Sequence, residues 1–269
     1  MTSLVFLKSA KLFSLAGLIL LNSLTPIDQG SSGKKEKSSA PDRVNNIVLV
    51  HGAWADGSGW EGVYKILKAK GYHITIVPNP NTSLSEDVKI TKAVLAMQEG
   101  PVILVGHSYG GAIITEAGDT SNVAGLVYVA AFAPDAGESL LKMQQAGPAD
   151  PNTPILPPRD GFIWVDKSKF HADFCADLPS EKAAFMADSQ VPVGLAAFTT
   201  DLTTAAWKSK KSWYIVSKND RMIPPDVERM MAKRAGSKIT EIAASHAVYI
   251  SHAAEVAAII EKAAMEANK

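Results

Sequence analysis

The chain has 269 residues, of which 46% are hydrophobic and 20% are charged, and its 27 basic residues balance 27 acidic ones. This length allows one core-bearing domain, with or without an insertion, and the zero net charge gives no electrostatic reason to expect a nucleic acid or an acidic membrane as a partner. The one cysteine, Cys175, excludes an intrachain disulfide. Because no glycine turn surrounds Cys175, we expect a half-buried structural residue there and not a nucleophile.

The first 27 residues are unlike the rest of the chain. Lys8 and Lys11 precede an uncharged apolar run over residues 12–24, which has the length of a signal-peptide core and is short for a membrane span. No Ala-x-Ala cleavage site follows, so residues 1–27 are predicted to be either a signal peptide or an uncleaved N-terminal anchor. Residues 28–45 are polar and are predicted to be a flexible linker. The expected location is therefore periplasmic or secreted, with retention by an anchor as the alternative.

From residue 46 to residue 269 we predict one α/β domain in which strands alternate with helices. Short apolar runs predict strands over 47–50, 74–77, 102–105, 123–129, 213–216 and 238–242. Helical spacing predicts helices over 60–70, 227–234 and 253–264, after the capping box of Ser83 and Glu86, and from Ala112 onward. This alternation implies a mostly parallel sheet of about six strands with helices on both faces. The carboxyl ends of all strands then share one edge, where the sites of such sheets form.

Residues 135–211 interrupt the alternation. This segment is rich in proline and aromatic residues and shows no strand–helix rhythm. An insertion after a strand end is expected to cover the site edge as a lid and to supply an apolar pocket wall. The same aromatic side chains are also expected to fill a small core of the insertion itself.

The strand over 102–105 leads into Gly106-x-Ser108-x-Gly110, and a helix follows. A tight turn between a strand and a helix is the context that a nucleophile elbow requires, and it leaves the serine hydroxyl at the carboxyl edge of the sheet. Glycines on either side remove side chains that would clash where strand and helix approach each other. The motif therefore predicts Ser108 as a nucleophile.

A serine hydroxyl is a poor nucleophile, so Ser108 needs a histidine base and a carboxylate that orients it, in the chain order Ser, Asp or Glu, His. His246 lies between the last strand and the last helix, where the base is expected, and we favour it over His252 at the helix start. Asp220 follows the strand over 213–216 and is the favoured acid, with a local turn residue as its alternative role. Asp135, which follows an earlier strand, stays open as the acid.

The reaction also needs donors for the oxyanion that forms when Ser108 attacks a carbonyl. We expect these to be the backbone N–H groups of Tyr109, directly after the nucleophile, and Ala53, in the loop after the first strand. Gly52 is expected to let that loop turn back toward the site. The chain contains neither an HExxH string nor a paired Cys–His spacing, so no metal and no other cofactor is expected.

The motifs together resemble the α/β-hydrolase superfamily, above all small bacterial esterase-like hydrolases and the plant methylesterase and hydroxynitrile lyase group. The resemblance covers residues 46 to 264 and rests on Val50-His51-Gly52-Ala53-Trp54, Gly106-His107-Ser108-Tyr109-Gly110-Gly111, Ala130-Ala131-Phe132-Ala133-Pro134-Asp135, Asp220-Arg221-Met222-Ile223-Pro224 and Ser245-His246. It implies the α/β-hydrolase fold, a triad of Ser108, Asp220 and His246, and Ala53 and Tyr109 as oxyanion donors, in agreement with the placement argument.

The sequence therefore predicts a cofactor-free serine hydrolase that cleaves small-molecule esters of small to medium apolar character through an acyl-enzyme. One alternative is a hydroxynitrile lyase, an enzyme that cleaves a C–C bond with the same triad. Lyases of the resembling group typically carry Thr at the position of Gly52 and Lys at that of Ala247, and both departures favour ester hydrolysis. The other alternative is a ligand-binding receptor that retains the triad, which nothing in the sequence favours.

Overall fold

The computed structural model of the protein describes residues 43–145 and 151–268. The predicted signal peptide or anchor and most of the predicted linker lie outside the described residues and stay predictions. No helix in the described ranges is long and apolar enough to cross a membrane. At the end of the expected linker, Arg43 lies 4.0 Å over the Tyr72 ring and the Val44 N–H donates to the Ala264 carbonyl at 2.9 Å. These residues are therefore already part of the folded domain.

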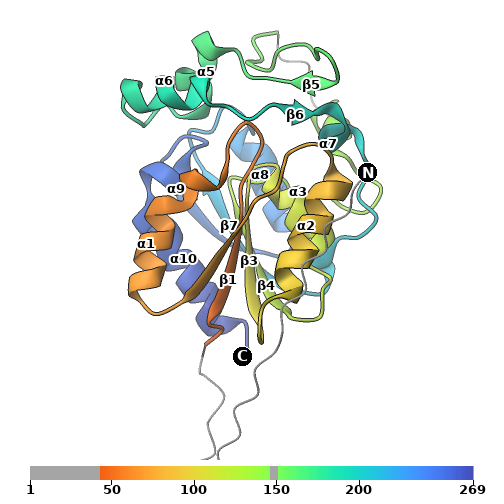
Figure 1. The fold of residues 1–269 in the computed structure, drawn as a ribbon, viewed down its shortest axis with the longest axis vertical. Helices are drawn as coiled ribbons and strands as arrows, with labels where there is room; N and C mark the ends of the chain where they lie inside the picture. The colour runs from red at the N-terminus through yellow and green to blue at the C-terminus, as the bar shows by residue number, and fades with distance from the viewer. Residues whose placement is uncertain (1–42, 146–150, 269) are drawn as a thin grey trace, which may run out of the picture. The chain divides into compact units, whose positions relative to one another are not determined.

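A sheet of six strands, in the order β2-β1-β3-β4-β7-β8, forms the centre of the domain (Figure 1), and every neighbouring pair is parallel. Its strands are β1 (Asn46–Val50), β2 (His73–Val77), β3 (Val102–His107), β4 (Val123–Val129), β7 (Lys211–Ser217) and β8 (Lys238–Ile242). Each strand predicted from the apolar runs is present, and only the ends differ. The predicted parallel sheet of about six strands is confirmed.

Helices cover both faces of this sheet (Figure 1). One face carries α1 (Glu61–Ala69) and α10 (Ala253–Glu266); the other carries α2 (Leu84–Ala96), α3 (Gly110–Ala117) and α8 (Pro225–Arg234). Along β1, Ile47 and Leu49 belong to the core under α1 and α10, whereas Val48 and Val50 belong to the core under α2, α3 and α8. The side chains alternate in this way because successive residues of a strand point to opposite faces of the sheet. The strand is buried on both sides, which explains its unbroken apolar sequence.

Besides small differences at the helix ends, two helical segments of the described chain outside residues 135–211 were not predicted from the sequence. The helix expected from Trp60 begins as a 3₁₀ turn, η1 (Gly57–Trp60), and an unpredicted short helix, α9 (Val248–Ser251), precedes α10. The capping box is present at α2, where the Ser83 Oγ accepts a hydrogen bond from the Glu86 N–H at 3.3 Å.

The described part of residues 135–211 consists of short elements with no regular alternation. They are α4 (Leu140–Gln145), β5 (Phe162–Ile163), α5 (Lys167–Phe174), α6 (Ser180–Asp188), β6 (Val193–Gly194), α7 (Leu195–Thr199) and η2 (Ala206–Lys208). In Figure 1, α5, α6, β5 and β6 lie above the carboxyl ends of the central strands. The Phe174 ring stacks on Phe170 at 4.7 Å and meets the His246 ring edge-on at 5.0 Å. Phe174 thus contributes both to a core of the insertion and to a wall over the sheet edge.

Candidate active site

The site lies where the strand order reverses, between β1 and β3. Val50 at the end of β1 is in register with Gly106 of β3, so the loops that follow the two strands start side by side. A Cβ atom on Gly52 would lie 2.7 Å from the Ser108 Cβ and 2.9 Å from the His107 carbonyl oxygen. Residue 52 therefore has to be glycine because there is no space for a side chain. The predicted reason, a backbone turn that only glycine adopts easily, is wrong, because the φ of Gly52 lies outside the left-handed region.

Ser108 occupies a strained turn between β3 and α3. Its φ is +53°, in the left-handed region that serine rarely adopts. The Ser108 N–H donates to the Val129 carbonyl at 3.2 Å, and the Ser108 carbonyl accepts from the Phe132 N–H at 3.1 Å, so β4 and the loop after it hold the turn. A Cβ on Gly106 would lie 2.5 Å from the Gly110 carbonyl oxygen. The glycines therefore permit the close contact of strand and helix that the motif predicted.

Ser108, His246 and Asp220 form a continuous hydrogen-bonded series. The His246 Nε2 lies 2.8 Å from the Ser108 Oγ, and the His246 Nδ1 lies 2.6 Å from the Asp220 Oδ2. The loops after β7 and β8 continue the parallel pairing of their strands, since the Lys218 N–H donates to Ile242 at 2.8 Å and the Asn219 N–H to Ala244 at 3.0 Å. This pairing brings Asp220 and His246 into contact.

The structure separates the two candidate acids. The Asp220 Oδ1 accepts from the N–H groups of Met222 and Ile223 at 2.7 and 2.9 Å, which fixes the carboxylate with its other oxygen toward His246. Asp135 instead forms a partly exposed ion pair with Lys208, and the hydrogen bond from Lys208 lowers the pKa of Asp135. Asp220 is the carboxylate that meets the histidine.

The other histidine and the cysteine do not enter this series. His252 Nδ1 lies 2.9 Å from the Ser251 Oγ and 3.8 Å from Asp177. Cys175 is fully buried and not half-buried as expected, because the end of α5 packs inward, and burial raises the pKa of its thiol to about 12. A thiol with so high a pKa is a weak nucleophile at neutral pH.

Ala53 and Tyr109, the expected oxyanion donors, are buried beside Ser108. Within residues 43–145 and 151–268, neither backbone N–H donates to a protein acceptor. The Tyr109 hydroxyl donates to the Asp87 Oδ2 at 2.6 Å, and the Asp87 Oδ1 accepts from the Asn81 N–H at 2.9 Å. Burial raises the pKa of Asp87 to about 6. Helix α2 thereby anchors the residue after the nucleophile.

His107, which the sequence analysis did not single out, supports the candidate base. Its Nε2–H donates to the His246 carbonyl at 2.9 Å, and its ring lies 4.7 Å from the His246 ring and 4.2 Å from the Tyr249 ring. Burial, with a smaller contribution from His246, lowers the pKa of His107 well below its ordinary value, so the ring stays neutral. Its position inside the serine motif was visible in the sequence, but its burial against the loop of His246 was not.

Residues of the insertion contact the loops that surround Ser108 and His246. Asp177, between α5 and α6, accepts hydrogen bonds from the Ser245 N–H at 3.0 Å, from the Ser245 hydroxyl, and from the Ser251 hydroxyl at 2.8 Å. Burial raises the pKa of Asp177, but these hydrogen bonds outweigh it and lower the pKa overall. The Phe198 ring lies 5.7 Å from Trp54 and 6.0 Å from Tyr109. The insertion therefore contacts both the loop that carries His246 and the loop that follows β1.

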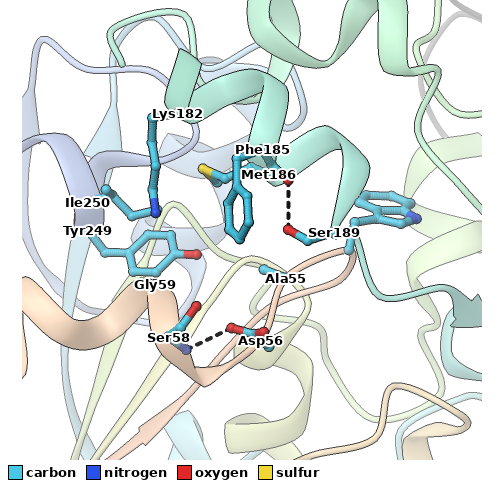
Figure 2. A pocket seen from close by; sticks show the side chains of 11 residues that line it. Ala55, Asp56, Ser58, Gly59, Lys182, Phe185, Met186, Ser189, Tyr249 and Ile250 are labelled. Atoms are coloured by element: carbon cyan, nitrogen blue, oxygen red, sulfur yellow. Dashed lines mark hydrogen bonds between the residues drawn. The ribbon is translucent and has the colours of Figure 1, made fainter. Parts of the chain in front are cut away.

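A pocket of about 110 Å³ opens between the loop that follows Ala53, helix α6 and the start of α9. Figure 2 shows Phe185 pointing from α6 toward the loop that carries Ala55 and Asp56. The pocket is lined by Trp54, Ala55, Asp56, Ser58, Gly59, Lys182, Phe185, Met186, Ser189, Tyr249 and Ile250. No member of the Ser108 series lines it, so the pocket lies beside the site and not within it. No group of three or more His, Cys, Asp or Glu side chains in the described ranges is placed to hold a metal ion.

Comparisons with known proteins agree with the observed fold. The alpha/beta hydrolase family matches residues 47–259. The chain is 30% identical to the alpha/beta hydrolase nvfD of Aspergillus novofumigatus over 82% of this chain and 97% of that protein. It is 29% identical to a carbendazim hydrolyzing esterase of a Nocardioides species over 64% of this chain and 79% of that protein. The crystal structure of a pyrethroid hydrolase from Sphingobium faniae superimposes with a TM-score of 0.70 at 26% identity, over 83% of this chain and 98% of the other.

Proposed function

Because the chain belongs to the alpha/beta hydrolase family, we propose that it cleaves carboxylic esters of small to medium apolar substrates with Ser108 as the nucleophile. The observation that carries this proposal is the series from the Asp220 Oδ2 through His246 to the Ser108 Oγ, with spacings of 2.6 and 2.8 Å. Relatives that are named as an esterase and a pyrethroid hydrolase support the class of reaction.

In this mechanism the His246 Nε2 takes the proton of the Ser108 hydroxyl as the oxygen attacks the ester carbonyl carbon. The backbone N–H groups of Ala53 and Tyr109 stabilise the resulting oxyanion. The C–O bond to the alcohol then breaks, and the alcohol leaves with the proton from His246. Water attacks the acyl-enzyme with His246 again as base. The bond between the Ser108 Oγ and the acyl carbon then breaks, the Ser108 oxygen takes the proton back from His246, and the acid is released. Asp220 accepts from the His246 Nδ1–H throughout and so fixes its tautomer.

The walls around Ser108 support an apolar substrate. Phe174 lies against His246, and Phe198 lies against Trp54 and Tyr109, so aromatic side chains line the loops next to Ser108. A substrate without charge loses little hydration free energy on entering such a site. The apolar segment within residues 1–27 supports export as a further part of this proposal, which fractionation of the producing cells tests directly.

The experiment is a panel of aryl and alkyl esters of increasing chain length, with lactones and amides, for the purified protein and its Ser108→Ala variant. We expect turnover of the shorter esters and a loss on the order of 10³ or more in the variant. An unchanged rate in the folded variant contradicts the nucleophile assignment. Cyanide release from a cyanohydrin without ester turnover assigns a lyase, and ligand binding without any turnover assigns a receptor.

A further inference from the structure

Glu228, on helix α8, is a fully buried carboxyl group outside the series of Ser108, His246 and Asp220. Its Oε2 accepts a hydrogen bond from the Ser217 N–H at 3.1 Å. Its Oε1 has no hydrogen-bond donor within the described ranges. A buried carboxylate with one backbone donor is unstable as an anion, so the unpartnered oxygen needs either a donor or a proton of its own.

Glu228 and Asp220 are both buried at the same turn after β7. Ser217 donates its N–H to Glu228, and its carbonyl accepts from the Asp220 N–H at 3.1 Å, so the two carboxyl groups face each other across this turn. Two carboxylates so close in apolar surroundings share one proton. Asp220 already accepts from the N–H groups of Met222 and Ile223 and contacts the His246 Nδ1, so both of its oxygens have hydrogen-bond donors. Glu228 has only the Ser217 N–H. The proton therefore belongs on Glu228.

The other titratable and charged groups around Glu228 do not change this assignment. Tyr214 on β7 donates its hydroxyl hydrogen to the Ala131 carbonyl. Arg229, adjacent on α8, is bound to Glu241 at 2.8 and 2.9 Å and to Asp226 at 2.8 Å. Burial, and next the charge of Asp220, raise the pKa of Glu228 well above its ordinary range.

We propose that Glu228 is a positioning residue for the reaction: as a neutral carboxylic acid it donates a hydrogen bond to Asp220 and holds that carboxylate toward His246. The role in turnover rests on the proposed function, whereas the protonation state does not. With Glu228 neutral and donating, the carboxyl pair carries a single negative charge, on Asp220 next to the His246 Nδ1. Ionisation of Glu228 at alkaline pH would place two anions together, disturb Asp220 and weaken the orientation of His246.

The first test observes the proton directly and does not depend on activity. Difference infrared spectra of the full-length protein near neutral pH should show a carboxylic-acid C=O stretching band that disappears in Glu228→Gln. The matched control is Asp226→Asn, on the same helix with an exposed side chain, which should leave the band in place. Absence of the band from the native protein overturns the proposal even if the esterase activity is present.

The second test measures the consequence for turnover. Glutamine has an amide N–H₂ that donates to Asp220 and an oxygen that accepts from Ser217, so Glu228→Gln should keep kcat within about threefold and retain activity at alkaline pH where the native enzyme loses it. Glu228→Met fills the space without a donor and should lower kcat about 10- to 100-fold with little change in KM.

The positioning role is overturned if Glu228→Gln folds but its kcat falls as far as that of Glu228→Met. It is also overturned if the pH profile of Glu228→Gln matches that of the native enzyme at alkaline pH. If Glu228→Met does not fold, the Gln variant's pH profile decides alone. If no ester is turned over by the native protein, the proposed function fails, while the infrared band still reports the proton on Glu228.

Discussion

The carboxyl edge of the sheet and the insertion above it contribute to the same site under different physical constraints. At the sheet edge, strand register places the groups. Val50 lies opposite Gly106, which sets the loop after β1 against Ser108, and continued pairing after β7 and β8 joins Asp220 to His246. At the lid, individual side chains such as Phe174 and Asp177 make the contacts.

For the proposed hydrolysis, this difference predicts that the sheet edge governs the reaction steps and that the insertion governs substrate selection. Groups placed by backbone hydrogen bonds across a buried parallel sheet have little freedom to move, which suits the sub-ångström demands of proton transfer. Groups on short elements such as α5 and α6 can be exchanged or displaced without altering the register of the sheet. Substitutions at the sheet edge should therefore reduce turnover, and substitutions in the lid should mainly change substrate binding.

The largest expected effect is at the acid. Asp220→Ala should lower kcat/KM by about 10³- to 10⁴-fold with retained folding, because His246 loses the acceptor that fixes its tautomer. Asp135→Ala is the matched control and should stay within about threefold of the native rate, since Asp135 pairs only with surface groups. Steady-state kinetics with an aryl ester measures both; a reversal of the two results would assign the acid to Asp135.

The next effect concerns the space beside the nucleophile. Gly52→Ala would place a Cβ 2.7 Å from the Ser108 Cβ, so either the oxyanion loop or the serine turn must shift. A displacement of this size should cost about 10²-fold in kcat while KM changes little. Kinetics combined with thermal unfolding checks this, and a variant that is both as stable and as active as the native protein would refute the close approach.

A smaller effect is expected at the lid. Asp177→Asn removes a charged acceptor of the Ser245 and Ser251 hydrogen bonds, so the lid should be held less tightly over the loop of His246. We expect KM to rise about three- to tenfold and kcat to change less. Asp188→Asn, an exposed lid residue paired with Lys167, is the control. A fall in kcat with constant KM would instead place Asp177 with the sheet-edge groups.

The smallest effect is a pH dependence of stability at Asp87. Burial raises its pKa from 3.8 to about 6, so between these values the folded protein binds a proton that the unfolded chain has lost. The resulting stability is fully present below pH 3.8 and is lost as the pH rises through about 6. The free energy of unfolding of the native protein, relative to Asp87→Asn, should fall by about 1 kcal/mol between pH 5 and pH 7 in denaturant titrations. A constant or increasing difference would contradict this.

The groups at the sheet edge were accessible from the sequence because their signals are local. Ser108 directly follows the end of β3, and Asp220 and His246 lie in the short loops after β7 and β8, so all three are placed at the edge where the strand ends of a parallel sheet meet. Strand placement alone left Asp135 open as an alternative to Asp220, because both residues follow strand ends. Only the contacts in the folded protein show that Asp220 bonds to His246 and that Asp135 pairs with Lys208.

The supporting residues could not be predicted, because their roles depend on contacts distant in sequence. Glu228 occupies an otherwise ordinary amphipathic helix, and only packing of α8 against the loop of Asp220 buries it. Asp177 gains its partners from Ser245 and Ser251. The insertion lacked a periodic signal because strands as short as Phe162–Ile163 and helices as short as Leu195–Thr199 do not span enough residues to show one.

In the proposed mechanism Ser108 carries the acyl group. Rapid acid quench of the protein mixed with an activated aryl ester, followed by mass spectrometry of proteolytic peptides, tests this most directly. We predict a mass increase equal to the acyl group on the peptide containing Ser108, formed at the rate of the first turnover and absent from Ser108→Ala. Turnover of the ester with no acylated peptide, or with the acyl group on another residue, would contradict the account.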